Sequence, residues 1–200
     1  MTKARLEAFS DGVIAILITI MVLELHSPPN SELSGLADTL PELATYLLSF
    51  VFLGIYWNNH HHLLQATSQI NGAVLWANLH LLFWLSLVPF ATRWMGQTSF
   101  ATVPTAVYGC VLLLSAIGFT ILVRAILACQ PPDSVLARAI GRDRKGKLSL
   151  VIYAAAIPLT MVAEWLAIAL FALVEVIWLV PDRRIEAQLT PPAQRHALRE

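Results

Sequence analysis

The sequence has few charged residues. Lys, Arg, Asp and Glu make up only 13% of its 200 residues, whereas 57% are hydrophobic and the mean hydropathy is +0.66. Soluble domains carry about 25% charged residues, so this composition excludes a soluble globular protein. We therefore interpret the chain as an all-α integral membrane protein without a soluble domain.

Cysteine is almost absent as well. Cys110 and Cys129 both lie in or at the end of one apolar segment, and neither has a partner at the spacing of a metal site. We assign both to packing. The run from His60 to His62 does not suit a single metal ion either, because successive residues of a helix point about 100° apart. The sequence therefore predicts no metal site.

The N-terminus lacks the features of a cleaved signal peptide. No cleavage site of the Ala-x-Ala type precedes the break at Ser27-Pro28-Pro29-Asn30, and Asp11 interrupts the apolar region. We expect the first apolar segment to be retained as a membrane helix.

Long apolar segments follow one another along the chain. Spanning the hydrocarbon layer takes about 20 apolar residues in a helix. Four segments fit one such helix each: Leu6–Leu25, Pro41–Gln65, Ala73–Met95 and Val103–Cys129. A fifth, Leu148–Val180, has 33 residues and fits either one long tilted helix or two short ones.

The positions of the basic residues decide between these two possibilities. Lys and Arg occur before the first segment, in a cluster over 138–147 and directly after the last segment, but are missing from the connection 25–40. The positive-inside rule then places both termini and the 130–147 linker in the cytosol, which requires an even number of crossings after Lys147. We predict six transmembrane helices in a unit over 1–181, the last two short and meeting near 158–164, followed by a polar cytosolic tail over 182–200.

The start of the first segment has an unusual polar pattern. Arg5-Leu6-Glu7-Ala8-Phe9-Ser10-Asp11 leads directly into an unbroken apolar run from Gly12 to Leu23. An ionisable group in lipid costs about 3 kcal/mol, so these groups should face protein or water. The junction therefore indicates an ion pathway.

The pattern Arg-x-x-x-Phe-Ser-Asp, together with Trp57-x-x-His60 and Asn78, resembles the transmembrane protein 175 family over roughly 5–129. This family comprises potassium-permeable channels of lysosomes and shorter prokaryotic relatives. The second half of the chain has no further Phe-Ser-Asp, which matches the single-unit prokaryotic form. One unit cannot enclose a pore, and the resemblance implies a homotetramer.

One stripe of the first helix is aliphatic. At 100° per residue, Ile16, Ile20, Leu23 and Ser27 fall within about 60° of one another, and Thr19 borders them. Periodicity alone favours ordinary packing for such a stripe. The resemblance instead implies that this helix lines the pore, with the main constriction at Ile16 and the narrow region continuing through Ile20 and Leu23. The sequence Thr-Val-Gly-Tyr-Gly is absent, so a carbonyl selectivity filter is not expected.

The resemblance also implies a hydrogen-bond network that holds the pore helix in place. The matching residues are Arg5, Phe9, Ser10, Asp11, Trp57, His60 and Asn78. Within it, His60 is the candidate partner of Asp11. The alternative is that Ser10 and Asp11 form a helix N-cap with a surface ion pair.

Glu24 lies close to the stripe at the far end of the first helix, and two interpretations of it stay open. If it faces the pore, a ring of carboxylates would enrich cations at the outer mouth. If it extends to the membrane interface, it has no special role.

The expected function is a potassium-permeable cation channel with moderate selectivity for K⁺ over Na⁺. The alternative on the same architecture is a proton channel or a poorly selective leak for monovalent cations. A membrane enzyme or scaffold is more distant, because no nucleophile accompanies Asp11 and His60. The expected partners are further copies of the chain and the lipid bilayer of a prokaryotic plasma membrane, with no nucleic acid and no cofactor apart from the permeant K⁺.

Overall fold

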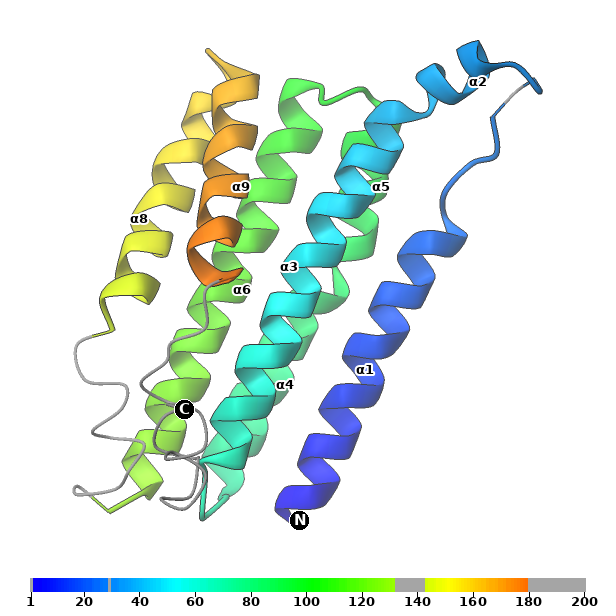
Figure 1. Cartoon of the computed structure of the whole chain (residues 1–200). Helices are drawn as coiled ribbons and strands as arrows, with labels where there is room; N and C mark the ends of the chain where they lie inside the picture. Colours follow the sequence, from blue (N-terminus) through cyan, green and yellow to red (C-terminus); the bar gives the residue numbers. More distant parts are fainter. Residues whose placement is uncertain (1, 29, 132–142, 180–200) are drawn as a thin grey trace, which may run out of the picture.

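The computed structural model describes residues 2–28, 30–131 and 143–179, and in these ranges it contains helices and no strand (Figure 1). The predicted cytosolic tail over 182–200 and most of the basic linker lie outside the described residues. The helices are α1 (Lys3–Leu23), α2 (Leu33–Asp38), α3 (Leu40–Gln65), α4 (Gly72–Ser86), α5 (Val88–Gln97), α6 (Thr102–Cys129), α8 (Arg144–Leu159) and α9 (Glu164–Leu179).

Four stretches of helix are long and apolar enough to cross a membrane. They are α1, α3, α6 and the combined stretch Gly72–Gln97 of α4 and α5. All four were predicted from hydropathy, and their ends agree with the prediction within about three residues. The prediction of an all-helical membrane protein is therefore confirmed.

The stretch Gly72–Gln97, which is the third along the chain, is divided, and this division was not predicted. Leu87 separates α4 from α5, and Pro89 stands in the first turn of α5. Proline has no N–H group to donate to the preceding turn, so it interrupts a helix but suits a helix start. The division thus follows from Pro89, whose effect on the backbone a hydropathy profile does not include.

The last apolar stretch forms two helices, as the charge distribution predicted. Helices α8 and α9 have 16 residues each and are joined by a turn over 160–163. Sixteen helical residues extend about 24 Å, somewhat less than the roughly 30 Å hydrocarbon layer. The total of six crossings stays a prediction.

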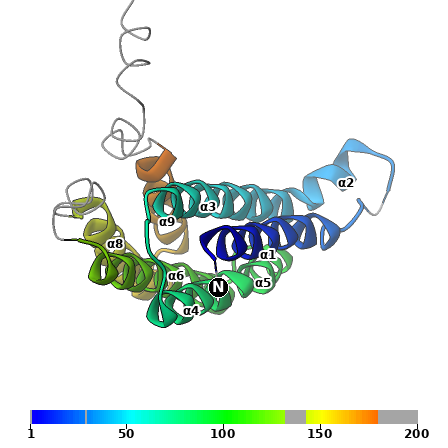
Figure 2. The same cartoon turned by 90° about the horizontal axis from the view of Figure 1, so that it is seen from below.

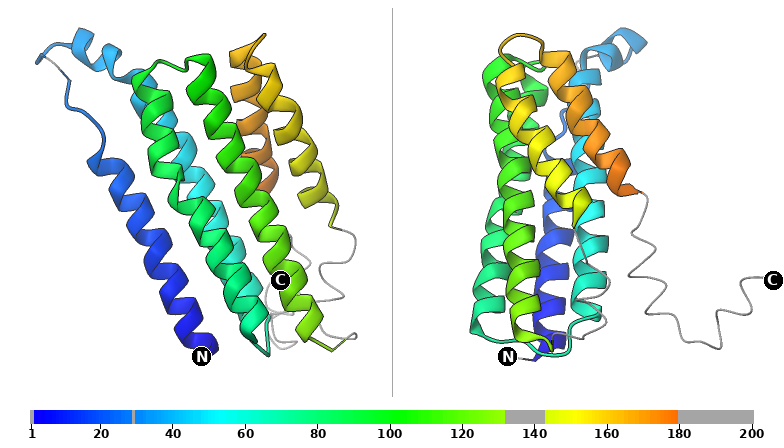
Figure 3. Two further views of the ribbon diagram at one scale, coloured as in Figure 1. Left: turned by 180° about the vertical axis from the view of Figure 1, so that it is seen from behind. Right: turned by 90° about the vertical axis from the view of Figure 1, so that its left-hand side faces the viewer.

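Helix α1 lies along one edge of the bundle, and α8 with α9 lies along the other (Figures 1 and 2). Helix α1 packs against α3, α4 and α5, whereas α6 packs against α4, α5 and α8. Figure 3 shows α2 beyond the end of α1 that is opposite the N-terminus. One long face of α1 is therefore left open in the single chain.

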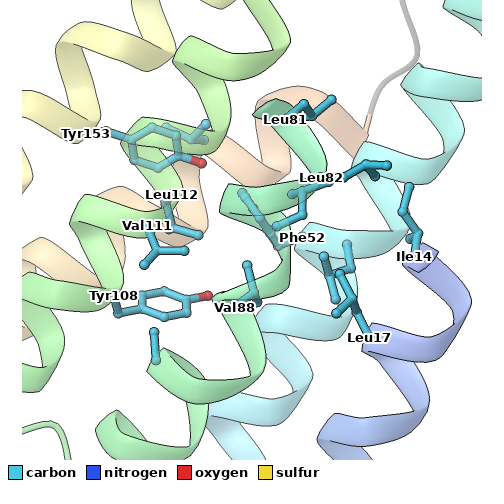
Figure 4. Close-up of a cluster of buried hydrophobic side chains, with 14 of the residues drawn as sticks. Ile14, Leu17, Phe52, Leu81, Leu82, Val88, Tyr108, Val111, Leu112 and Tyr153 are labelled. Atoms are coloured by element: carbon cyan, nitrogen blue, oxygen red, sulfur yellow. The ribbon is translucent and has the colours of Figure 1, made fainter. Parts of the chain in front are cut away.

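The interior is a continuous cluster of apolar side chains (Figure 4). Ile14 and Leu17 lie on the α1 side of this cluster, and Tyr108 and Tyr153 lie at the opposite side. Two glycines of α6, Gly109 and Gly118, allow close helix packing. A Cβ atom at Gly118, for example, would lie 3.2 Å from the Cα atom of Leu81. Small residues at such contacts are typical of helices that associate in a membrane.

Candidate functional site

Helix α1 has two apolar faces in different surroundings. The buried face consists of Leu6, Ser10, Ile14, Leu17 and Met21, which recur every three or four residues. The face on the other side carries Ile16, Ile20 and Leu23, with exposed fractions of 57%, 39% and 82%. The predicted aliphatic stripe therefore lies on the side of α1 that the rest of the chain leaves open.

The stripe is shorter than predicted. Helix α1 ends at Leu23, and the backbone from Leu25 to Pro28 is not helical. A residue that precedes a proline is disfavoured in the helical conformation, and Ser27 is followed by Pro28. Ser27 is therefore not part of the helical stripe, and this part of the prediction is wrong.

Thr19 stays on the open face but has a local hydrogen bond. Its hydroxyl donates to the carbonyl oxygen of Ile16 at 2.9 Å. The side chain as a whole is exposed.

A buried chain of hydrogen bonds fixes the inner face of α1. The Asn78 Nδ2 group of α4 donates to Ser10 Oγ at 2.9 Å, and Ser10 Oγ donates to the Leu6 carbonyl at 2.9 Å. Asn78 Oδ1 lies 2.7 Å from His60 Nε2 of α3. Because an amide oxygen only accepts, His60 is the donor, and its Nε2 carries the proton. All three side chains are at most 1% exposed, so this chain joins three helices in the interior.

Asp11 takes a different partner from the predicted one. Its Oδ1 atom accepts a hydrogen bond of 3.0 Å from the indole Nε1 of Trp57. His60 is bonded to Asn78 instead, so the expected pair of His60 and Asp11 is not formed. Ser10 and Asp11 are neighbours on a helix and point about 100° apart. The predicted single network is therefore two, one buried around Ser10 and one at the surface around Asp11.

The surface network continues to a second histidine. His61 Nδ1 lies 3.3 Å from Glu7 Oε1, and the His61 ring stacks on Trp57 with 6.0 Å between the ring centroids. The second pair of side chains between α1 and α3 had not been predicted. The sequence could have indicated this second pair, because Glu7 and Asp11 are one turn apart on α1 and Trp57 and His61 are one turn apart on α3.

Arg5 and Phe9 are exposed and belong to neither network within the described chain. Arg5 has no hydrogen bond or ion pair to a described residue, and Phe9 is 48% exposed. Both lie on the same side of α1 as Ile16. The alternative that Ser10 and Asp11 cap the helix is wrong, because α1 begins at Lys3, two turns earlier.

Glu24 is turned toward α5. Its Oε1 atom lies 3.6 Å from Arg93 Nη1, and close by, His26 contacts Glu42 at 3.2 Å. Arg93 had not been singled out from the sequence. The sequence could have drawn attention to Arg93, because it is the one Lys or Arg residue inside the third apolar segment. Arg93 of the same chain therefore balances part of the Glu24 charge.

No group of three or more His, Cys, Asp or Glu side chains among the described residues is placed to hold a metal ion.

Comparisons with known proteins identify relatives of this chain. The family model described as "Endosomal/lysosomal potassium channel TMEM175" matches residues 5–89. A protein named potassium channel from a Chryseobacterium species is 51% identical over 189 residues, which cover 94% of this chain and 98% of that protein. The crystal structure of a lysosomal potassium-selective channel TMEM175 homolog from Chamaesiphon minutus has a TM-score of 0.80 at 27% identity, over 90% of this chain and 97% of that one.

Animal proteins match over a shorter part. The endosomal/lysosomal proton channel TMEM175 of Homo sapiens is 31% identical over 111 residues, and the chain spans 21% of its length. The protein of the same name from Danio rerio is 26% identical over 128 residues, or 24% of its length.

The helical membrane fold and these relatives define the class: the protein is a membrane-spanning ion channel and not an enzyme. Within this class the chain belongs to the TMEM175 family.

The buried chain of hydrogen bonds generates a prediction about stability. Replacing Asn78 by Leu keeps the branched side-chain shape but removes the acceptor for His60 and the donor to Ser10, which costs about 1–3 kcal/mol. We expect a lower melting temperature in detergent. The control is Asn58→Leu, since Asn58 is half-buried and has no hydrogen bond to a described side chain. Equal melting temperatures for Asn78→Leu and the unmodified protein would contradict this role.

Proposed function

We propose that this protein is a potassium-permeable cation channel formed by four copies of the chain around the open face of α1. The observation that carries the proposal is the row of exposed aliphatic side chains Ile16, Ile20 and Leu23 on a helix whose other face is fixed in the bundle. Relatives that are named potassium channels support the choice of ion. The channel resides in the plasma membrane of a prokaryote, with both termini in the cytosol and six crossings per chain, and needs no cofactor.

The proposed constriction is a ring of four Ile16 side chains, continued by Ile20 and Leu23. A narrow apolar ring gates by wetting and dewetting, so a small movement of α1 is enough to open or close it. The ring offers no oxygen ligands to replace the hydration shell of an ion. Selectivity then follows the cost of partial dehydration, which is lower for K⁺ than for Na⁺, and is moderate.

The polar groups beside the stripe hold α1 in place and do not coordinate the ion. Ser10 is fully buried behind the open face, and Asp11 already accepts a hydrogen bond from Trp57. Glu24 stands near the outer end of the stripe, where its pairing with Arg93 limits its attraction for cations.

A proton channel is the second candidate function. The animal relatives named proton channels favour it. The two functions share the architecture, and they differ in which gradient drives current.

Ion flux from liposomes that contain only this protein tests the function. Under a K⁺ gradient we expect flux that exceeds the flux under an equal Na⁺ gradient. A pH-sensitive dye inside the same liposomes measures proton entry. Proton entry without K⁺ flux would replace the first function by the second, and no flux under any gradient would overturn both.

The assembly is tested by native mass. Identical chains close most readily as a cyclic ring, and we expect detergent-solubilised protein to have the mass of four chains of 22.0 kDa each plus bound detergent. A stable monomer that still conducts ions in liposomes would contradict the tetramer.

The pore stripe is tested by Ile16→Asn. An amide in the ring favours water in the constriction, so we expect several-fold higher K⁺ flux and a K⁺/Na⁺ selectivity closer to one. The matched control is Val151→Asn, since Val151 is 66% exposed and belongs to α8, the helix at the edge of the bundle away from α1 (Figure 2). If Ile16→Asn leaves flux and selectivity unchanged while Val151→Asn alters them, α1 does not line the pore.

A further inference from the structure

A cavity lies on the side of α3 away from α1, between α3, α6, α8 and α9. Its empty space, counted together with the open space at its mouth, is about 540 Å³. No residue of α1 lines it. The cavity is therefore separate from the proposed pore.

The walls of this cavity are unusually aromatic. Its aromatic lining residues are Phe52, Tyr56, Phe119, Tyr153 and Trp178. Phe52 and Tyr56 pack with 4.6 Å between ring centroids, and Phe119 meets Tyr56 edge-on at 5.8 Å. The faces of such rings attract organic cations.

One acidic side chain in this cavity lacks a partner. Glu175 of α9 is only 5% exposed, and its Oε1 atom has no hydrogen-bond partner among the described residues. A carboxylate at membrane depth is costly unless it is paired, and such a residue normally marks a functional site. A positively charged ligand would supply the missing partner.

The part of the lining that the structure describes contains acidic side chains and no basic ones. Besides Glu175, the cavity is lined by Asp143, whose Oδ1 atom accepts from the Gly146 N–H at the start of α8. Among the described side chains that line the cavity there is no Lys, Arg or His. Lys145 stands next to it, where its Nζ atom lies 6.0 Å from the centroid of the Trp178 ring and 3.4 Å from the Ile177 carbonyl oxygen.

The geometry points to a binding site for a small organic ammonium ion, with the ammonium group on Glu175 and the apolar body of the ligand among the aromatic rings. A bare metal cation suits the cavity less well, because the aromatic walls offer few oxygen ligands to replace its hydration shell. The bound molecule lies behind α3, so it occupies the protein without plugging the stripe of α1.

The test is equilibrium binding of 2-phenylethylammonium to the full chain purified in a nonionic detergent. This probe combines one ammonium group with one aromatic ring, and 2-phenylethanol is its neutral counterpart. We expect saturable binding of the ammonium compound only. Glu175→Gln should weaken binding about tenfold to a hundredfold, the usual worth of a hydrogen bond to a charged group.

Glu164→Gln is the matched control, because Glu164 lies on the same helix but outside the lining, and its binding should equal that of the unmodified protein. Ala116→Phe fills the cavity while keeping Glu175, and should abolish binding even if Glu175→Gln does not fold. Equal binding by Glu175→Gln or Ala116→Phe, equal binding of 2-phenylethanol, or no saturable binding would each overturn the proposal. The readout does not depend on ion flux, so it stands apart from the proposed channel function.

Discussion

The rotation of α1 about its own axis depends on one set of contacts, the buried chain from His60 through Asn78 to Ser10. Hydropathy cannot set this rotation, because nearly every side of α1 is apolar and would be equally at home in lipid. Hydrogen bonds are directional, and a polar group left unpaired in an apolar interior is costly. With Ser10 held inward, Ile16 and its neighbours have to face outward.

The two polar networks share α1 and α3 but differ in environment. The chain around Asn78 is shut off from solvent, whereas the contacts of Asp11 with Trp57 and of Glu7 with His61 lie at the surface of the single chain. The inner chain fixes the buried face of α1, and the outer contacts add a second link between α1 and α3 at the surface. The aromatic cavity with Glu175 is a third polar feature, and it lies on the other side of α3.

Hydropathy and the charge distribution predicted the helices well, including the separation of α8 from α9. These features depend on composition over some twenty residues, which a sequence displays directly. Pairing was harder to predict. His60 was the predicted partner of Asp11, but Trp57, less than one turn away on α3, takes this place. The outcome depends on how α4 brings Asn78 within reach of His60. The end of α1 before Ser27 was predictable from Pro28, whereas the contact of Glu24 with Arg93 requires the packing of α1 on α5.

The shortness of α8 and α9 has a consequence for the surrounding lipid. If α1 faces the axis of a ring, the opposite edge of the bundle forms the outer circumference, where these two helices meet the acyl chains. A helix of about 24 Å does not match a hydrocarbon layer of about 30 Å, so the bilayer there thins, or flanking side chains reach out to the headgroups. In such a ring the perimeter would suit thinner membranes, and bilayer thickness would act on the protein from outside.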